Sequence, residues 1–145
     1  MMFKFRKLLA EDFIQWKMLW TDYLVFYKTD LPEEITNTAW DRIVSGEIES
    51  IAVFDDEKLI AFMHFHTQIN TWKIGKVYYL EDLFVSSEYR RQGIAKTLIE
   101  HLFELAQNNG YERVYWLTDK NNKQAQTLYE KFATQTDYVL YKAEF

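Results

Sequence analysis

Arg90-Arg91-Gln92-Gly93-Ile94-Ala95 joins a strand-like run, Val77 to Val85, to a helical pattern that continues to about Asn108. The first N–H groups of a helix have no partner within it, and the helix dipole adds partial positive charge there. Gly93 lets a ligand approach the main chain closely, and Ala95 keeps the next turn thin. We therefore expect this junction between strand and helix to bind phosphate groups through main-chain N–H groups.

The composition predicts one domain over residues 1–145, large enough for a core without cross-links. Hydrophobic residues make up 48% of the chain, which excludes disorder, and the absence of cysteine excludes disulfides and thiolate chemistry. No signal peptide or membrane-spanning run is found, so a cytoplasmic protein without membrane contact is expected. The net charge of −5 argues against nucleic-acid binding and would suit a cationic partner.

Hydrophobic periodicity predicts an α/β (α+β) fold with a mixed central sheet flanked by helices, in the order β-α-α-β-β-β-α-β-α-β. The strand before Gly93 and the strand after the following helix should be parallel neighbours with a right-handed crossover. The expected strands are Phe3–Leu8, Ser50–Phe54, Leu59–His66, Val77–Val85, Tyr111–Thr118 and Tyr138–Phe145. The expected helices are Glu11–Tyr27, Pro32–Val44, the segment from Gly93 to Asn108, and a last one carrying Ala125 to Phe132.

Two motifs give the chain a resemblance to a known family. The segment Arg90–Ala95 resembles the Arg/Gln-x-x-Gly-x-Gly/Ala hallmark of the GNAT superfamily of N-acetyltransferases, and Asn122–Tyr129 resembles its Asn-x-x-Ala-x-x-Leu-Tyr element. Tyr79–Val85 and Val114–Thr118 are similar to strands of the histone/polyamine (diamine) acetyltransferase-like branch. One departure is Asp137-Tyr138, where many relatives have Gly-Phe.

The resemblance implies acetyl-CoA as co-substrate, and no group of metal ligands is found in the sequence. The main chain of Gln92, Gly93, Ile94, Ala95 and Lys96 would hold the pyrophosphate, with added charge from Arg90 or Arg91. Family precedent also assigns cofactor contacts to the residues Leu83, Phe84, Val85 and Asn122.

The chemistry expected is direct attack of an amine on the acetyl thioester. Few primary amines are unprotonated at neutral pH, so a base is required, and Glu81 is the candidate. Glu81 and Asp82 are neighbours in a strand and point to opposite faces, so they should not share one role unless a bulge redirects one of them. Glu81 is assigned to proton removal or amine binding, and Asp82 to a weaker contact with the substrate. Tyr129 lies where the family has its general acid, although its helical spacing alone would fit a core aromatic residue.

The acceptor pocket is expected to include Trp20 and Tyr27, since aromatic rings beside carboxylates suit an ammonium ion. His64 and His66 alternate on one strand, but without a third ligand they predict packing or surface positions instead of a metal site.

Three functions remain open at this point. The acceptor could be the primary amine of a small molecule (a polyamine, an amino acid or an analogue) or a protein lysine, and a non-catalytic acyl-CoA-binding module is a third possibility. The aromatic C-terminal strand could also complete the sheet of a second copy, which would give a homodimer.

Overall fold

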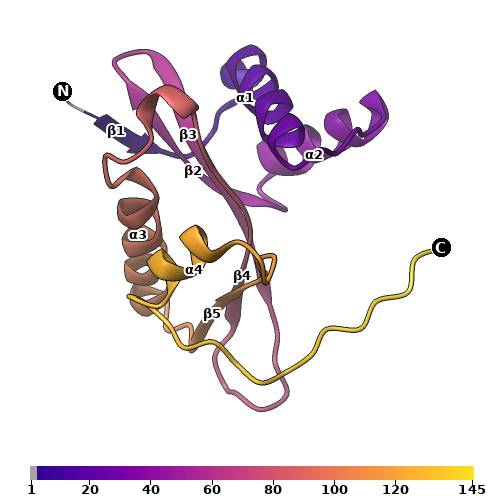
Figure 1. Cartoon of the computed structure of the whole chain (residues 1–145), viewed down its shortest axis with the longest axis vertical. Helices are drawn as coiled ribbons and strands as arrows, with labels where there is room; N and C mark the ends of the chain where they lie inside the picture. The colour runs from indigo at the N-terminus through magenta and orange to yellow at the C-terminus, as the bar shows by residue number, and fades with distance from the viewer. Residues whose placement is uncertain (1–2) are drawn as a thin grey trace.

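A computed structural model describes residues 3–145 and shows one five-stranded mixed sheet with helices on both faces (Figure 1). The strands stand in the order β1-β2-β3-β4-β5, which is also their order along the chain. Their bounds are β1 Phe3–Arg6, β2 Glu49–Asp55, β3 Lys58–Gln68, β4 Val77–Val85 and β5 Arg113–Trp116. Neighbours from β1 to β4 are antiparallel, whereas β4 and β5 are parallel, which confirms that these two strands are parallel neighbours as predicted.

Four α-helices cover the sheet: α1 Phe13–Phe26, α2 Glu33–Ser45, α3 Ile94–Asn108 and α4 Lys123–Tyr129. Short 3-10 turns, Ala10–Asp12 and Ser87–Tyr89, precede α1 and α3. α1 and α2 lie on one face of the sheet, and α3 lies on the other with α4 beside it (Figure 1). Between residues 3 and 145, no helix is both long and apolar enough to cross a membrane.

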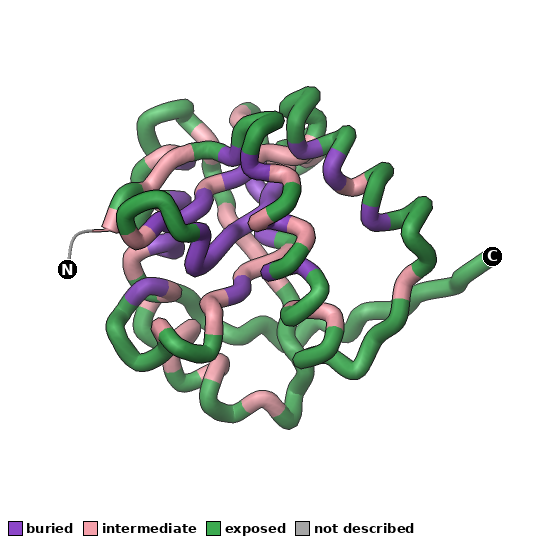
Figure 2. The backbone as a smooth tube through the Cα atoms, turned by 90° about the horizontal axis from the view of Figure 1, so that it is seen from above, coloured by how far each residue is buried: buried purple, intermediate pink, exposed green. Residues whose placement is uncertain are grey.

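Each face of the sheet carries its own hydrophobic core. On the α1 face, Trp16, Trp20 and Trp40 pack against β3 residues such as Phe62. On the opposite face, Leu98 and Leu102 of α3 are fully buried in a second cluster. The buried residues collect in the central strands between these layers (Figure 2). Because β3 is covered on both faces, nearly all of its buried residues are apolar.

The C-terminal strand predicted over Tyr138–Phe145 is wrong for the isolated chain, because these residues have neither helix nor strand. The segment leaves the body of the molecule as an extended tail (Figure 1). An extended, apolar sequence forms a strand only where a neighbouring edge supplies hydrogen bonds, and the tail contacts no such edge here. β5 is consequently the last strand of the described sheet.

Candidate active site

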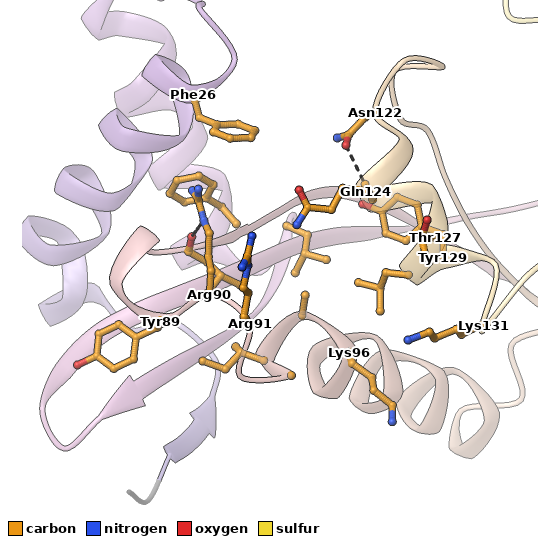
Figure 3. A pocket seen from close by; sticks show the side chains of 18 of the residues that line it. Phe26, Tyr89, Arg90, Arg91, Lys96, Asn122, Gln124, Thr127, Tyr129 and Lys131 are labelled. Carbon is orange, nitrogen blue, oxygen red and sulfur yellow. Dashed lines mark hydrogen bonds between the residues drawn. The ribbon is translucent and has the colours of Figure 1, made fainter.

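A cavity of about 650 Å³ opens where the carboxyl end of β4, the start of α3 and helix α4 meet. The end of α1 closes it from the far side of the sheet with Phe26 and Tyr27. In Figure 3, Arg90 and Arg91 lie on one side of this cavity, and Asn122, Gln124 and Tyr129 lie on the other. The predicted site residues that line it are Tyr27, Leu83, Phe84, Val85, Arg90, Arg91, Gly93, Ile94, Ala95, Lys96, Asn122 and Tyr129.

The first turn of α3 offers main-chain donors to the cavity. Gly93 is the N-cap residue with φ of 77°, and no side chain caps this helix. The left-handed conformation favours glycine, and a Cβ at Gly93 would meet nothing within 4 Å. The N–H groups at the start of α3 are therefore not used by a capping side chain, which is the arrangement that binds phosphate.

The charge on the cavity wall has one sign. Of its lining residues, all within the described chain, Arg90, Arg91, Lys96 and Lys131 are cationic and none is a carboxylate. This contrasts with the chain's net charge of −5. Arg90 is held in place, because its Nε donates to the Val85 carbonyl oxygen at 3.1 Å and its guanidinium lies 5.1 Å from the centre of the Phe26 ring. Such a wall favours a polyanionic ligand.

Helix α4 supplies the other side of the cavity. Asn122 Oδ1 accepts a hydrogen bond from the Ala125 N–H at 3.2 Å, which caps the helix. Tyr129, at the last helical position, packs its ring 5.4 Å from that of Trp116 on β5. Burial, and secondarily the nearby Tyr27, raises the pKa of Tyr129. At neutral pH the Tyr129 hydroxyl thus keeps its proton and can donate it.

A bulge in β4 brings two adjacent carboxylates to the same face of the sheet. The pairing with β3 shifts between His64 and Phe65: His64 lies opposite Asp82, and Phe65 lies opposite Leu80, so Glu81 is the extra residue. Asp82 reaches His64, and Glu81 reaches His66 at 3.2 Å. Since His64 and His66 are two residues apart on one strand, both acidic groups lie on the α1 face.

Asp82 is fixed by a hydrogen-bond chain into the core. Its carboxylate accepts the Tyr23 hydroxyl at 2.5 Å and contacts His64 Nδ1 at 2.9 Å. The Trp16 indole N–H donates to His64 Nε2 at 3.1 Å. An indole N–H can only donate, so Nε2 is the acceptor and the N–H of Nδ1 donates a hydrogen bond to Asp82. Asp82 therefore accepts two hydrogen bonds, as an ionised carboxylate does.

The acidic pair and the cavity meet at Tyr27. The Tyr27 ring packs 5.0 Å from that of Tyr23, whose hydroxyl donates to Asp82. Tyr27 also lines the cavity that contains Tyr129. Tyr27 is thus in contact with the residue that holds Asp82 and with the cavity.

The structure separates some predicted residues from this cavity. Trp20 is only 7% exposed and donates its indole N–H to Thr36, so it packs beneath the site instead of lining it. Gln92, Glu81 and Asp82 are not on the cavity wall. His64 is buried, and nowhere between residues 3 and 145 do three His, Asp or Glu side chains gather as a metal site.

Lining residues that the sequence did not indicate include Phe26, Tyr89, Gln124, Thr127, Leu128 and Lys131.

Comparison with known proteins agrees with this geometry. The sequence profile of the Acetyltransferase (GNAT) family matches residues 11–133. The D-amino-acid N-acetyltransferase HPA3 of Saccharomyces cerevisiae is 37% identical over 131 residues, covering 88% of this chain and 81% of its own. The thialysine N-epsilon-acetyltransferase of Caenorhabditis elegans is 33% identical over 114 residues, covering 75% of this chain and 67% of its own.

A possible acetyltransferase from Clostridium difficile 630 has the same fold, with a TM-score of 0.88, 17% sequence identity, and coverage of 100% of this chain and 99% of its own. The chain belongs to the GNAT family of acetyltransferases. It is an acetyl-CoA-dependent N-acetyltransferase that transfers acetyl groups to amines.

Proposed function

We propose that this enzyme acetylates the primary amine of a small molecule, which is a polyamine, an amino acid or an analogue, by direct attack on acetyl-CoA. The observation that carries the proposal is a single cavity that holds an uncapped helix N-terminus, four cationic side chains and Tyr129. The named activities of the two sequence relatives, on D-amino acids and on thialysine, favour a small acceptor over a protein.

The residues around the cavity fit a nucleotide carrier with a diphosphate. The N–H groups at the start of α3 would hold the diphosphate, and Arg90, Arg91, Lys96 and Lys131 would balance its charge. Leu83, Phe84 and Val85 at the carboxyl end of β4, with Asn122 on α4, would contact the pantetheine arm. When bound, acetyl-CoA supplies the thioester whose carbonyl carbon the amine attacks.

On the acceptor side, Glu81 and Asp82 would attract the ammonium group and help to remove its proton. Asp82 is fixed by Tyr23 and His64, whereas the Glu81 side chain is 49% exposed and free to exchange protons with water. We assign Asp82 to orienting the amine and Glu81 to proton removal, directly or through water. The aromatic ring of Tyr27 offers a further contact for a cation.

Tyr129 would protonate the departing thiolate. A thiol has a pKa near 8.5, taking cysteine as a guide, so the phenol of Tyr129 is a suitable donor at neutral pH. The raised pKa of Tyr129 makes loss of its proton before this step rarer.

We propose that the enzyme works in the cytoplasm, as one domain over residues 1–145 and as a homodimer.

The test is release of free thiol from acetyl-CoA across a panel of amines: D- and L-amino acids, thialysine, ornithine, polyamines and a lysine-containing peptide. Turnover with one or more free amines, in excess of that with the peptide, supports the proposal. Turnover with the peptide alone would contradict it and favour a protein-lysine acetyltransferase. Binding of acetyl-CoA without turnover on any amine would contradict the catalytic roles given to Glu81 and Tyr129.

A further inference from the structure

His64 is a buried polar residue beneath the acceptor side of the site. Its side chain is 3% exposed, and it lies on β3 directly opposite Asp82 of β4, where the pairing of the strands shifts. A buried imidazole cannot hydrogen-bond to water, so each ring nitrogen needs a partner within the protein. Both nitrogens of His64 have one: Trp16 on one edge of the ring and Asp82 on the other. His64 therefore joins the core of the α1 face to an acidic side chain of the site.

Three contacts fix the orientation of the His64 ring. Its face stacks on the Phe62 ring, with the ring centres 4.6 Å apart and the planes 5° from parallel. On its edges, Nε2 accepts from the fully buried Trp16, and Nδ1 lies 2.9 Å from Asp82 Oδ2. Turning the ring over would break both hydrogen bonds and leave buried groups without partners, which is costly. The N–H of Nδ1 is thus held in one direction.

Trp16 and Asp82 select the same tautomer of His64. A neutral imidazole has a proton on one nitrogen and a lone pair on the other. With the proton on Nε2, two N–H groups would face each other at Trp16, and the lone pair of Nδ1 would face a carboxylate oxygen. With the proton on Nδ1, both edges are satisfied. The position of the proton is therefore determined from both sides of the ring.

Asp82 receives its two hydrogen bonds on different oxygens. The Tyr23 hydroxyl donates to Oδ1 at 2.5 Å, and Nδ1 of His64 donates to Oδ2. Burial, and secondarily the charge of Asp82, raises the pKa of Tyr23, so its hydroxyl keeps the proton that it donates. An ionised carboxylate accepts about four hydrogen bonds, so lone pairs remain for a further donor such as an ammonium group. Since both oxygens are held, the directions of these lone pairs are fixed.

The neighbouring carboxylate has much less support. Within residues 3–145, the one side-chain hydrogen bond of Glu81 joins it to His66 at 3.2 Å, and these two side chains are 49% and 28% exposed. Glu81 can change its orientation, whereas Asp82 cannot do so without breaking two hydrogen bonds. The two adjacent acidic residues thus differ in rigidity, and the rigid one depends on His64 and Tyr23.

We propose that His64 is a positioning residue for the acceptor amine. It does not touch the amine; its Nδ1–H holds Oδ2 of Asp82, so that the carboxylate meets the ammonium group in a single orientation. Without this hydrogen bond the carboxylate can rotate, and part of its interaction with the amine is lost because the site is no longer preorganised. The inference rests on the proposed function, in which Asp82 orients the amine, whereas the tautomer of the His64 ring does not.

Thiol-release kinetics test the role of His64, with the fastest free amine of the panel as the varied substrate. His64→Met fills the space without a hydrogen-bond donor, so KM for the amine should rise about 5–50-fold while kcat changes less than about threefold. Thr36→Val is the matched control, because it also leaves a buried indole N–H, that of Trp20, without its acceptor. It should lower the melting temperature but leave KM for the amine unchanged.

The variant His64→Asn separates positioning from stability. The side-chain nitrogen of asparagine is as many bonds from the main chain as Nδ1, so it can donate to Asp82, although the contact with Trp16 is lost. KM for the amine should return to within about threefold of the parent value while the melting temperature stays low. A KM that rises in step with the loss of melting temperature in all three variants would overturn the proposal.

A double-mutant cycle shows whether His64 acts through Asp82. With the carboxylate removed in Asp82→Ala, nothing is left for His64 to hold, so adding His64→Met should change KM for the amine by less than about twofold. An equal effect of His64→Met with and without Asp82 would overturn the proposal, as would an unchanged KM in His64→Met alone. An Asp82→Ala chain with the parent's KM would instead contradict the proposed contact between Asp82 and the amine.

NMR of the histidine ring nitrogens tests the same inference without turnover. The chain has three histidines, and the spectrum of His64→Met assigns the signals of His64. At pH 7 this ring should have its proton on Nδ1 and none on Nε2, and binding of the amine in the presence of CoA should shift the Nδ1–H signal. His101, on α3 at the opposite face of the sheet, is the internal control and should not shift. A proton on Nε2 of His64, or an Nδ1–H signal that saturating amine leaves unmoved, would overturn the proposal.

Discussion

Replacing Tyr129 by Phe removes one hydroxyl from the cavity and leaves the ring in place. Within residues 3–145 the Tyr129 hydroxyl makes no hydrogen bond, so no buried partner is left without one. The ring keeps its contact with Trp116. The variant should therefore fold with nearly unchanged stability, within about 0.5 kcal/mol.

The effect on the reaction should be much larger. A positioned general acid contributes about 10²–10⁴-fold to a rate. Since each factor of ten corresponds to about 1.36 kcal/mol, the loss equals roughly 2.7–5.4 kcal/mol of transition-state stabilisation. The hydroxyl matters mainly in the transition state, so kcat and kcat/KM should fall together while the affinity for acetyl-CoA changes by less than about threefold.

The assay is thiol release at saturating acetyl-CoA, combined with calorimetric titration of CoA and thermal unfolding of both proteins. Tyr89→Phe is a matched control, because Tyr89 also lines the cavity but donates its hydroxyl to Asp55 at 2.6 Å. It should keep most of the turnover. A Tyr129→Phe variant that turns over as fast as the parent would refute the assignment of Tyr129 as the acid.

Three other substitutions test separate parts of the account. Gly93→Val places a β-branched residue at a φ of 77° and a side chain in the cavity, so calorimetry should show CoA affinity reduced at least tenfold with the fold retained by circular dichroism. Asp82→Asn should raise KM for the amine about 10–100-fold, because the charge that attracts ammonium is lost; an unchanged KM would contradict that role. Asp12→Asn removes the carboxylate that binds Arg6 at 2.7 Å and should cost about 1.5–3 kcal/mol in urea unfolding at pH 7. The hydrogen bond from Arg6 lowers the pKa of Asp12, so this stabilisation is complete above the unfolded value near 3.9 and is lost as pH falls through the folded value. A cost that does not begin to shrink as pH falls below the unfolded value would show another origin.

Local chemistry made the cofactor side of the site predictable from sequence. Gly93 at the start of an amphipathic helix, directly after a strand, defines both the turn and the main-chain donors. The position of Asn122 directly before a helical pattern predicts that it caps the helix. These features depend on residues that are close together in the chain, so they can be recognised from the sequence without knowledge of the tertiary structure.

The acceptor side depends on tertiary structure and was less predictable. The bulge that turns Glu81 and Asp82 to one face is a shift in pairing between β3 and β4, which no local pattern reveals. Lys131 reaches the cavity only because of how α4 docks beside α3. Trp20 has the same helical spacing as its aromatic neighbours, so only packing shows that it is buried.

The central claim is that main-chain N–H groups at the start of α3 bind a diphosphate. Amide NMR of the isotopically labelled protein during titration with CoA tests it at the residues concerned. The largest shifts are expected at Gly93, Ile94, Ala95 and Lys96, and they should shrink with 3′-phosphorylated adenosine that lacks the diphosphate. Saturable binding with these four amides unmoved would contradict the claim.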